Sequence, residues 1–427
     1  MCKNLSFADC ELAILRTSVD MIEKKEGQKL VHSPTITTVI QMVEKFIKEN
    51  KCIIYGGTAI NNILPEKDQF YDYEYELPDY DFFSTEPMKL AKNLADLFAK
   101  KGYDVEAKSG VHHGTFKVFV DQLGVADITY LHPELYKMLS KSVIVKKGLM
   151  YAPANFLRQS MFLELSRPLG DVSRWEKVLK RLNALNKNYP LVRKHCKVQR
   201  KMSSKRHEDK LFHTIKHYFI KENVVFIGGY ANALYTTHTR SPQLENLPDF
   251  DVLVNDPEEI AKELVQLLEK NGYQATMKEH EAIGELVSTH YSISVDDDYV
   301  AFLYKPVACH SYNEIKDGNR MIKVGTIDTL LSYYLAFMYA DRDYFDENRL
   351  LCLSSTLFRV QQENRLAQKG LLKRFGIKCY GVQPTLKSIR EENSRLYETL
   401  DPKSEEFKER FLKYIPKSAK TRKNKLK

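Results

Sequence analysis

The chain has 427 residues, which is too long for one compact domain and suits two or three. Hydrophobic residues make up 43% and charged residues 28%, and no apolar run approaches the roughly 18 residues of a membrane span, so we expect a globular protein outside the membrane. The 65 Lys and Arg exceed the 56 Asp and Glu, giving a net charge of +9 that favours a polyanionic partner without requiring one.

The N-terminus lacks a basic start followed by an apolar stretch, so we expect no secretory signal. The seven cysteines are scattered and lack the spacing of a zinc site. We therefore expect them to be buried or incidental thiols.

The peptide FIKEN occurs twice, at residues 46–50 and 219–223. Each copy precedes a short apolar run, a Gly-Gly pair and an alanine-containing segment of helical character, in KCIIYGGTAINNIL and VVFIGGYANALY. The segments LPDYDFF and LPDFDVL, and then KKGYDVEAK and KNGYQATMK, follow in the same order. The chain therefore contains one structural unit twice, predicted as strand, tight turn, helix and strand.

Glycines at a strand-to-helix turn allow a phosphate to approach the backbone, and the first N–H groups of the helix can bind it. Gly56, Gly57 and Thr58 are therefore candidates for holding the tail of a nucleoside triphosphate. Gly-Gly turns are common, so this pattern alone has little weight.

Asp79 and Asp81 alternate on a predicted strand and would share one face of it. Residues 115–120 and 125–130 alternate around a turn and predict a β-hairpin that brings Asp127 beside them. Three neighbouring carboxylates repel one another unless cations lie between them, and Mg²⁺ prefers oxygen ligands. We expect two ions here, of the kind that catalyse in-line nucleotidyl transfer.

The second unit has Asp249 and Asp251, but aligning Pro306 with Pro133 places Val300 opposite Asp127. We expect this copy to be inactive because valine cannot bind a metal. Helices are predicted after each unit, over residues 154–165 and 175–185, and over 327–340 and 349–366.

Residues 180–216 are strongly basic and are either a solvated linker or a strip that binds RNA. The candidate RNA contacts are Arg193, Lys194, Lys197, Arg200 and Lys201. The basic residues 417–427 are predicted to be a disordered tail.

The Gly-Gly turn, the Asp-Tyr-Asp pair and the third aspartate resemble the DNA polymerase β-type nucleotidyltransferase superfamily. YGGTAINNILP, LPDYDFF and LELSRPLGDVSRWEKVLKRLNALNKNYP resemble, more narrowly, the catalytic subunit of poly(A) polymerases of large DNA viruses, the poxvirus and giant-virus type. The implied fold is α/β (α+β), a duplicated nucleotidyltransferase unit with a mixed sheet, flanking helices and a helical N-terminal segment. The implied bounds are 1–32 for that segment, 33–147 for the catalytic domain, 148–206 for a helical and basic connection, 207–416 for a degenerate second domain, and 417–427 for the tail.

The resemblance implies transfer of AMP from ATP to the 3′ end of mRNA, with Asp79, Asp81 and Asp127 binding Mg²⁺ or Mn²⁺. Asn155 and Lys177 are candidate nucleotide contacts by position, the alternative for each being an ordinary helix-surface residue. The implied partners are RNA, ATP and either a second copy or a subunit resembling a cap methyltransferase, and the implied location is the host cytoplasm and the virion. A tRNA-end-adding or oligoadenylate-making enzyme and a non-catalytic RNA-binding scaffold remain alternatives.

Overall fold

The structure is a computed structural model that describes residue 2 and residues 6–191, 208–236, 250–317, 319–364 and 373–417. The chain forms two compact units. The first unit comprises residues 1–131, 143–152 and 391–427, and the second comprises residues 132–142 and 153–390. The domain bounds given above from the sequence stay a prediction. In the described part of the chain, no helix is long and apolar enough to cross a membrane.

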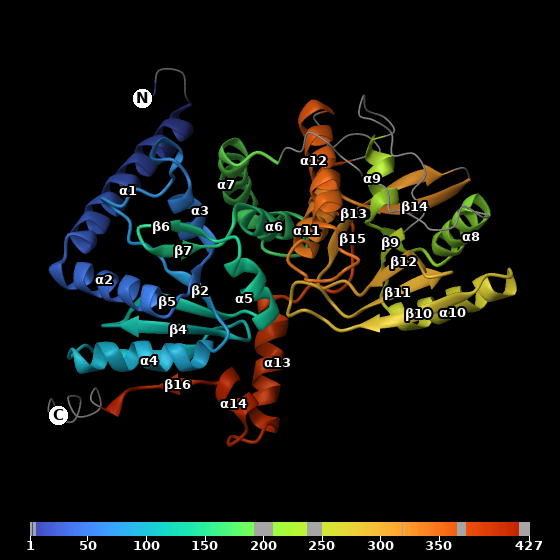
Figure 1. The fold of residues 1–427 in the computed structure, drawn as a ribbon. Coiled ribbons are helices and arrows are strands. Elements are labelled where there is room, and N and C mark those ends of the chain that lie inside the picture. The colour runs from blue at the N-terminus through green and yellow to red at the C-terminus, as the bar shows by residue number, and fades with distance from the viewer. Residues whose placement is uncertain are drawn as a thin grey trace. The chain divides into compact units, whose positions relative to one another are not determined.

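The first unit is built on one mixed sheet with the strand order β16-β3-β4-β5-β2-β1-β7-β6 (Figure 1). Its strands are β1 (Ile53–Ile54), β2 (Asp81–Ser84), β3 (Val105–Ser109), β4 (Thr115–Val120), β5 (Leu123–Tyr130), β6 (Ile144–Lys146), β7 (Leu149–Tyr151) and β16 (Lys413–Tyr414). Its helices are α1 (Phe7–Val31), α2 (Pro34–Glu49), α3 (Gly56–Ile63), η1 (Glu66–Asp68), α4 (Pro87–Lys100) and α14 (Glu405–Arg410). Helix α13 (Leu386–Thr399) runs from the second unit into the first.

Helix α4 covers one face of β3, β4 and β5, as Figure 1 shows. Its buried side chains recur at helical spacing, as in Leu94 and Phe98, and β4 buries alternate residues, Phe116 and Val118 among them. The predicted hairpin is therefore confirmed as β4 and β5. The residues between the buried ones, including Lys117, lie on the opposite face of the sheet.

The second unit has a sheet with the order β10-β11-β12-β9-β8-β14-β13-β15. Its strands are β8 (Val225–Phe226), β9 (Phe250–Leu253), β10 (Ala275–His280), β11 (His290–Val295), β12 (Asp298–Tyr304), β13 (His310–Asp317), β14 (Arg320–Gly325) and β15 (Cys379–Tyr380). Its helices are α5 (Pro133–Ser140), α6 (Ala154–Leu165), η2 (Val172–Arg174), α7 (Trp175–Asn188), α8 (Glu208–Lys221), α9 (Gly229–Thr236), α10 (Pro257–Lys270), α11 (Ile327–Phe337) and α12 (Glu347–Asn364). The four helices predicted after the units are thus confirmed within a few residues.

The duplication is confirmed strand by strand. Strands β3-β4-β5-β2-β1-β7-β6 correspond in order to β10-β11-β12-β9-β8-β14-β13. The central pairs agree in direction as well, since β2 and β5 are parallel, as are β9 and β12. The FIKEN peptide closes α2 in one copy and α8 in the other, directly before the first strand. One edge strand is added to each sheet, β16 beside β3 and β15 beside β13.

The expectation of seven thiols was wrong. Cys2 is bonded to Cys10 and Cys309 to Cys379, and Cys352 is also in a disulfide. Cys52 is a free, buried thiol whose pKa is raised to about 12 by burial. Spacing along the chain did not indicate these pairs because Cys309 and Cys379 are 70 residues apart and meet only through the pairing of β13 with β15.

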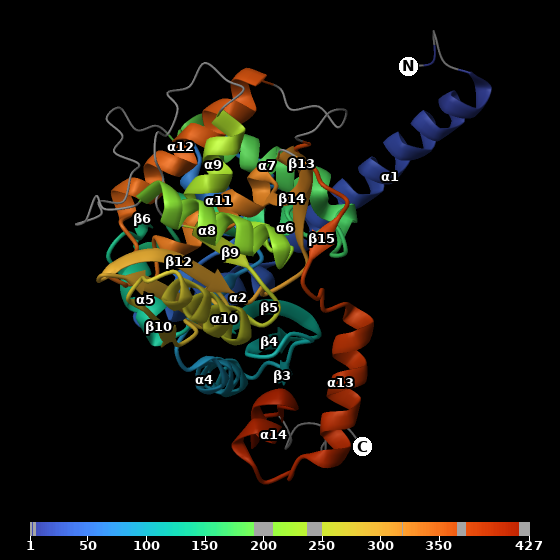
Figure 2. The same ribbon diagram turned by 90° about the vertical axis from the view of Figure 1, so that its right-hand side faces the viewer.

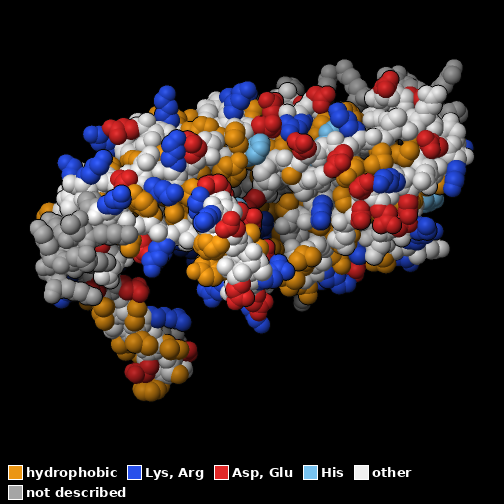
Figure 3. All heavy atoms as spheres, turned by 90° about the horizontal axis from the view of Figure 1, so that it is seen from below, with side chains coloured by type: hydrophobic (Ala, Val, Ile, Leu, Met, Phe, Trp, Pro, Cys, Tyr) orange, Lys and Arg blue, Asp and Glu red, His pale blue; other side chains and the backbone are white. Residues whose placement is uncertain are grey.

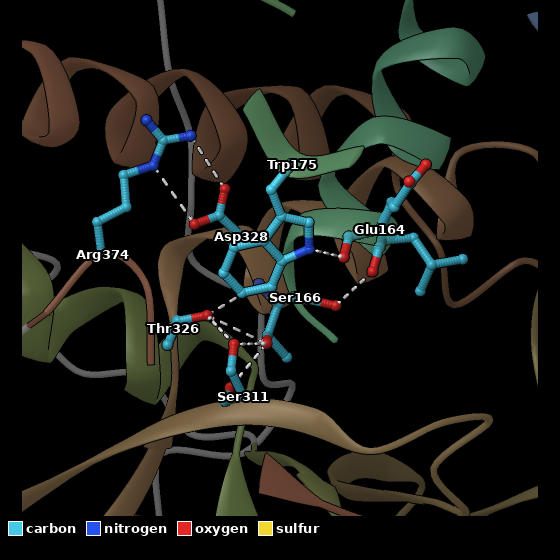
Figure 4. Close-up of polar contacts among 9 residues, drawn as sticks. Glu164, Ser166, Trp175, Ser311, Thr326, Asp328 and Arg374 are labelled. Atoms are coloured by element: carbon cyan, nitrogen blue, oxygen red, sulfur yellow. Dashed lines mark hydrogen bonds and ion pairs between the residues drawn. The ribbon is translucent and has the colours of Figure 1, made fainter. Parts of the chain in front are cut away.

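A buried ion pair anchors α11 in the second unit (Figure 4). Asp328, in the first turn of the helix, has a fully buried side chain and accepts hydrogen bonds from Arg374 at 3.0 and 3.3 Å. Burial raises the pKa of Asp328, and the guanidinium of Arg374 opposes that shift. Nearby, Trp175 donates from Nε1 to the carbonyl oxygen of Glu164 at 3.1 Å, which ties α7 to α6.

Replacing Asp328 by alanine should lower the free energy of unfolding of the second unit by about 3–5 kcal/mol, because Arg374 would keep a buried charge without its partner. Urea unfolding followed by Trp175, the sole tryptophan of the chain, reports this unit. Glu134→Ala, which breaks the more exposed pair with Arg342, is the matched control and should cost less than about 1 kcal/mol. Equal losses in the two variants would contradict the assignment of Asp328 as a stabilising residue.

Candidate active site

The turn from β1 into α3 brings the backbone close to β2. Gly56 has a positive φ of 71°, and a Cβ added to it would lie 2.6 Å from Oδ2 of Asp81. The preceding N–H, of Tyr55, donates to the carbonyl oxygen of Asp81 at 2.9 Å. Glycine is therefore required at position 56 both by its backbone conformation and by the neighbouring carboxylate.

The three aspartates lie on neighbouring segments of the first unit. Asp81 opens β2 and pairs in register with Asp127 on the parallel strand β5. Asp79 lies two residues before the start of β2, and its carbonyl oxygen accepts from Oγ1 of Thr58 at 2.6 Å, which fixes it to α3. The N–H of Asp127 donates to the carbonyl oxygen of Tyr80, between the other two aspartates, at 3.0 Å.

The pKa of the Tyr55 hydroxyl is affected by all three carboxylates. Burial raises its pKa most, and the negative charges of Asp81, Asp127 and Asp79 each raise it further. Its ring stacks on Phe83 with centroids 3.9 Å apart. All three carboxylates are therefore close enough to Tyr55, the residue before the Gly-Gly turn, to influence its hydroxyl electrostatically.

Lys117 supplies a positive charge to this group. It lies on β4 directly opposite Asp127 and donates from Nζ to Oδ2 of that residue. Among the described residues, no three His, Cys, Asp or Glu side chains are gathered closely enough to hold a metal ion. The donor chemistry, three carboxylates on adjacent segments, nevertheless fits a hard divalent cation, and the half-exposed Lys117 can withdraw from Asp127.

The second unit repeats this geometry without its chemistry. A Cβ on Gly228 would lie 2.1 Å from Oδ2 of Asp251, as Gly56 lies against Asp81. The residue in register with Asp251 is Phe302, so the predicted match of Val300 with Asp127 was wrong by two residues. Pro306 follows Phe302 by four residues, whereas Pro133 follows Asp127 by six, so an alignment of the two prolines displaces the match. The consequence is unchanged, because Phe302 is buried and binds no metal; Asp249 lies outside the described residues.

Aromatic side chains fill the space around Asp251, which is only 6% exposed. Tyr304 donates to its Oδ1 at 3.5 Å. A small pocket beside it is lined mainly by aromatic and aliphatic side chains together with Arg349. The second unit therefore offers little room for a nucleotide at this position.

The other candidate contacts lie elsewhere. Asn155 and Lys177 belong to the second unit, on α6 and α7. Asn155 accepts a hydrogen bond from Arg158, a side chain only 1% exposed that also binds Asn186, so it has a structural partner; Lys177 is exposed. The candidate RNA contacts Arg193, Lys194, Lys197, Arg200 and Lys201 lie outside the described residues.

Sequence reasoning did not identify Tyr55 or Lys117. The position of Tyr55 directly before Gly56 and Gly57 is a signal in the sequence that this side chain lies near the carboxylates. Lys117 could be placed opposite Asp127 only from the hairpin register, which shifts between Val118 and Phe119.

Replacing Gly56 by alanine should weaken Mn²⁺ binding at the aspartates about tenfold, because the new Cβ would displace the carboxylate of Asp81. Electron paramagnetic resonance of free Mn²⁺ measures this affinity. Gly148→Ala is the control, since Gly148 also has a positive φ, 77°, but would contact only Lys48, at 3.6 Å. Equal Mn²⁺ affinity in both variants would rule out the steric role of Gly56.

Comparison with known proteins supports the predicted resemblance. Residues 41–171 match the family model described as poly(A) polymerase catalytic subunit. A protein of Acanthamoeba polyphaga mimivirus, named as a poly(A) polymerase catalytic subunit, is 30% identical over 169 residues, which are 38% of this chain and 28% of the relative. A protein of the same name from African swine fever virus (strain Badajoz 1971 Vero-adapted) is 31% identical over 163 residues, which are 36% of this chain and 34% of the relative.

The chain thus matches about a third or less of the length of these curated relatives. Among solved structures, the Megavirus polyadenylate synthase superposes with a TM-score of 0.83 at 20% identity, over 100% of this chain and 90% of that one. This likeness confirms the predicted α/β fold with its mixed sheets and flanking helices. Residues 41–171, which contain the Gly-Gly turn and all three aspartates, carry the sequence pattern of the poly(A) polymerase catalytic subunit family.

Proposed function

We propose that this chain is a template-independent poly(A) polymerase that adds AMP from ATP to the 3′ end of mRNA. The observation that carries the proposal is the register of Asp81 with Asp127 beside the Gly56 turn. This arrangement lies in the segment that matches the poly(A) polymerase family. Its second copy has lost the third carboxylate, which leaves one such arrangement among the residues that the structure describes.

In this proposal, Asp79, Asp81 and Asp127 would hold two Mg²⁺ or Mn²⁺ ions, with Asp127 on the side of the attacking 3′ hydroxyl. Such ions, when bound, activate that hydroxyl and stabilise the leaving pyrophosphate in an in-line displacement. The first N–H groups of α3, from Gly56, Gly57 and Thr58, would bind the triphosphate. Asp127 orients the acceptor end, and Gly56 keeps the backbone of the turn clear of the Asp81 carboxylate.

The defining experiment incubates the purified protein with a labelled RNA primer, Mg²⁺ or Mn²⁺, and each nucleoside triphosphate separately. We expect extension with ATP and little with the other three. Equal use of all four nucleotides, or addition limited to a tRNA end, would favour another transferase of this fold. No extension with any of them would favour the non-catalytic RNA-binding scaffold.

Asp127→Asn should lower the extension rate on the order of a thousandfold while ATP still binds, because the amide cannot replace the carboxylate at the ion that holds the 3′ hydroxyl. Single-turnover extension and equilibrium ATP binding separate the two effects. The matched control is Asp251→Asn, which changes the second-copy aspartate at the position of Asp81. This variant protein should extend primers at the wild-type rate. The site assignment would be wrong if an Asp79→Ala/Asp81→Ala double variant kept that rate.

The proposed partners are the RNA 3′ end and, for processive extension, a second copy of the chain; a subunit resembling a cap methyltransferase is the alternative. Helix α1 presents exposed apolar side chains, among them Leu12, Leu15, Val19 and Ile22. Figure 2 shows α1 extending away from the sheet of its own unit, and Figure 3 shows hydrophobic side chains along the helix at its lower left.

From the resemblance to viral poly(A) polymerase catalytic subunits, we propose that the protein acts in the host cytoplasm and is carried in the virion.

Light scattering should give a mass twice the 49.6 kDa of one chain, and Leu15→Glu/Ile22→Glu should reduce it to that of one chain, because charges would enter an apolar contact. Val145→Glu is the control, since Val145 is 61% exposed on β6, away from α1. A wild-type mass of one chain would contradict self-association and favour a separate processivity subunit.

A further inference from the structure

Three lysines and two aspartates form one row across the sheet of the first unit. In register, Asp81 on β2 pairs with Asp127 on β5, and Asp127 with Lys117 on β4. Lys117 pairs in turn with Lys108 on β3, and Lys108 with Lys413 on β16. Directly opposed residues of neighbouring strands project from the same face, so these five side chains share one side of the sheet.

Several contacts fix this face as the one opposite α4. Tyr414, which follows Lys413, donates to Oδ1 of Asp96 on α4 at 2.8 Å, so Lys413 projects to the other side. Lys413 is exposed and Lys117 is 40% exposed. The lysines are therefore accessible from the same side as the candidate catalytic carboxylates.

The lysines of the row begin next to Asp127 and continue toward the β16 edge of the sheet. Neighbouring strands are about 4.8 Å apart, so Lys117, Lys108 and Lys413 extend over about 10 Å on the side of Asp127 away from the Gly-Gly turn. The Gly-Gly turn is the triphosphate side of the proposed site, and Asp127 is its acceptor side. The lysines thus lie where the RNA leading up to the reacting 3′ hydroxyl must run.

An aromatic ring accompanies the lysines. Phe119, two residues after Lys117, lies on the same face, and Nζ of Lys108 lies 4.2 Å from its ring centroid. Lysines beside an aromatic ring are the combination with which proteins bind single-stranded nucleic acid, by contacts to phosphates and by stacking of a base.

The second unit provides an internal comparison. Lys278 occupies the position of Lys108, but Ser292 stands in register with it where the first unit has Lys117. Ser292 is also the residue opposite Phe302, which replaces Asp127. Strand β10 ends the described sheet, so nothing in its order corresponds to β16 and Lys413. The lysine row and the third carboxylate are therefore absent together from the same copy.

We propose that Lys117, Lys108 and Lys413 bind the phosphate backbone of the acceptor RNA strand just upstream of its 3′ end. The inference rests on the proposed polyadenylation, because it concerns the acceptor of that reaction. Lys117 has two roles in this proposal. Its ammonium binds Asp127 in the structure, and it binds the RNA once a cation occupies that carboxylate. Lys108 and Lys413 touch no candidate metal ligand and are the residues to change.

The test compares Lys108→Gln/Lys413→Gln with Lys89→Gln/Lys100→Gln, which removes the same charge from α4 on the other face. Fluorescence anisotropy with a short oligoadenylate, without ATP, gives the RNA affinity over a range of KCl concentrations. The first variant should bind several-fold more weakly and reduce the slope of log affinity against log salt by about 1.4, which is two single-strand phosphate contacts. The KM for ATP should stay unchanged, and the α4 variant should behave as wild type.

A salt slope equal in both variants, with wild-type extension activity, would contradict this inference alone. A raised KM for ATP with unchanged RNA affinity would also overturn it, because the lysines would then serve the nucleotide. A reduced salt slope for Lys108→Gln/Lys413→Gln, together with no primer extension by the wild-type protein, would instead contradict the proposed function and still support RNA binding by these lysines.

Discussion

The electrostatic repulsion between Asp81 and Asp127 is the constraint on which the first unit depends. The two residues stand in register on neighbouring parallel strands, about 4.8 Å apart along the sheet, and Asp79 adds a third charge just before β2. Such a group is stable only beside positive charge, which Lys117 supplies from the next strand. The turn at Gly56 then has to pass the carboxylate of Asp81 without a side chain.

The second unit shows what the same sheet becomes once that constraint is removed. Strand order and directions persist, because they depend on the apolar face and on the helices that cover it. On the other face Phe302 replaces the third carboxylate, and Asp251 is buried with a hydrogen bond from Tyr304. A single buried carboxylate with a hydrogen-bond donor needs no cation. The fold is therefore independent of the three positions that the proposed chemistry requires, and this independence allows one copy to lose them.

Local patterns predicted most of the fold and part of the site. Alternation in residues 115–130 predicted the hairpin, and the repeated peptide predicted the duplication. Both signals lie within short stretches of consecutive residues, so they can be found without knowing long-range contacts. Predictions that needed an exact register or a distant contact were wrong or were not made. Val300 was matched to Asp127 although Phe302 holds that position, and the pairing of Cys309 with Cys379 depends on a strand contact between residues far apart in the chain. The role of Lys117 also depends on register, which a bulge changes without altering the alternation of apolar residues.

The two copies have been extended at opposite edges of their sheets. In the second unit, β15 is added beside β13, where a disulfide holds it. In the first, β16 is added beside β3, and Ser109 holds the chain before it by accepting from the N–H of Leu412 at 2.7 Å and donating to the carbonyl oxygen of Glu409 at 2.9 Å. A strand at the β3 edge covers exposed backbone groups, but so would one at the other edge. Protection of an edge therefore does not explain the choice. The strand beside β3 adds Lys413 to the lysine row, so under the proposed function the first copy gains basic surface on the acceptor side of Asp127, while the second copy, which lacks the third carboxylate, is extended at the other edge.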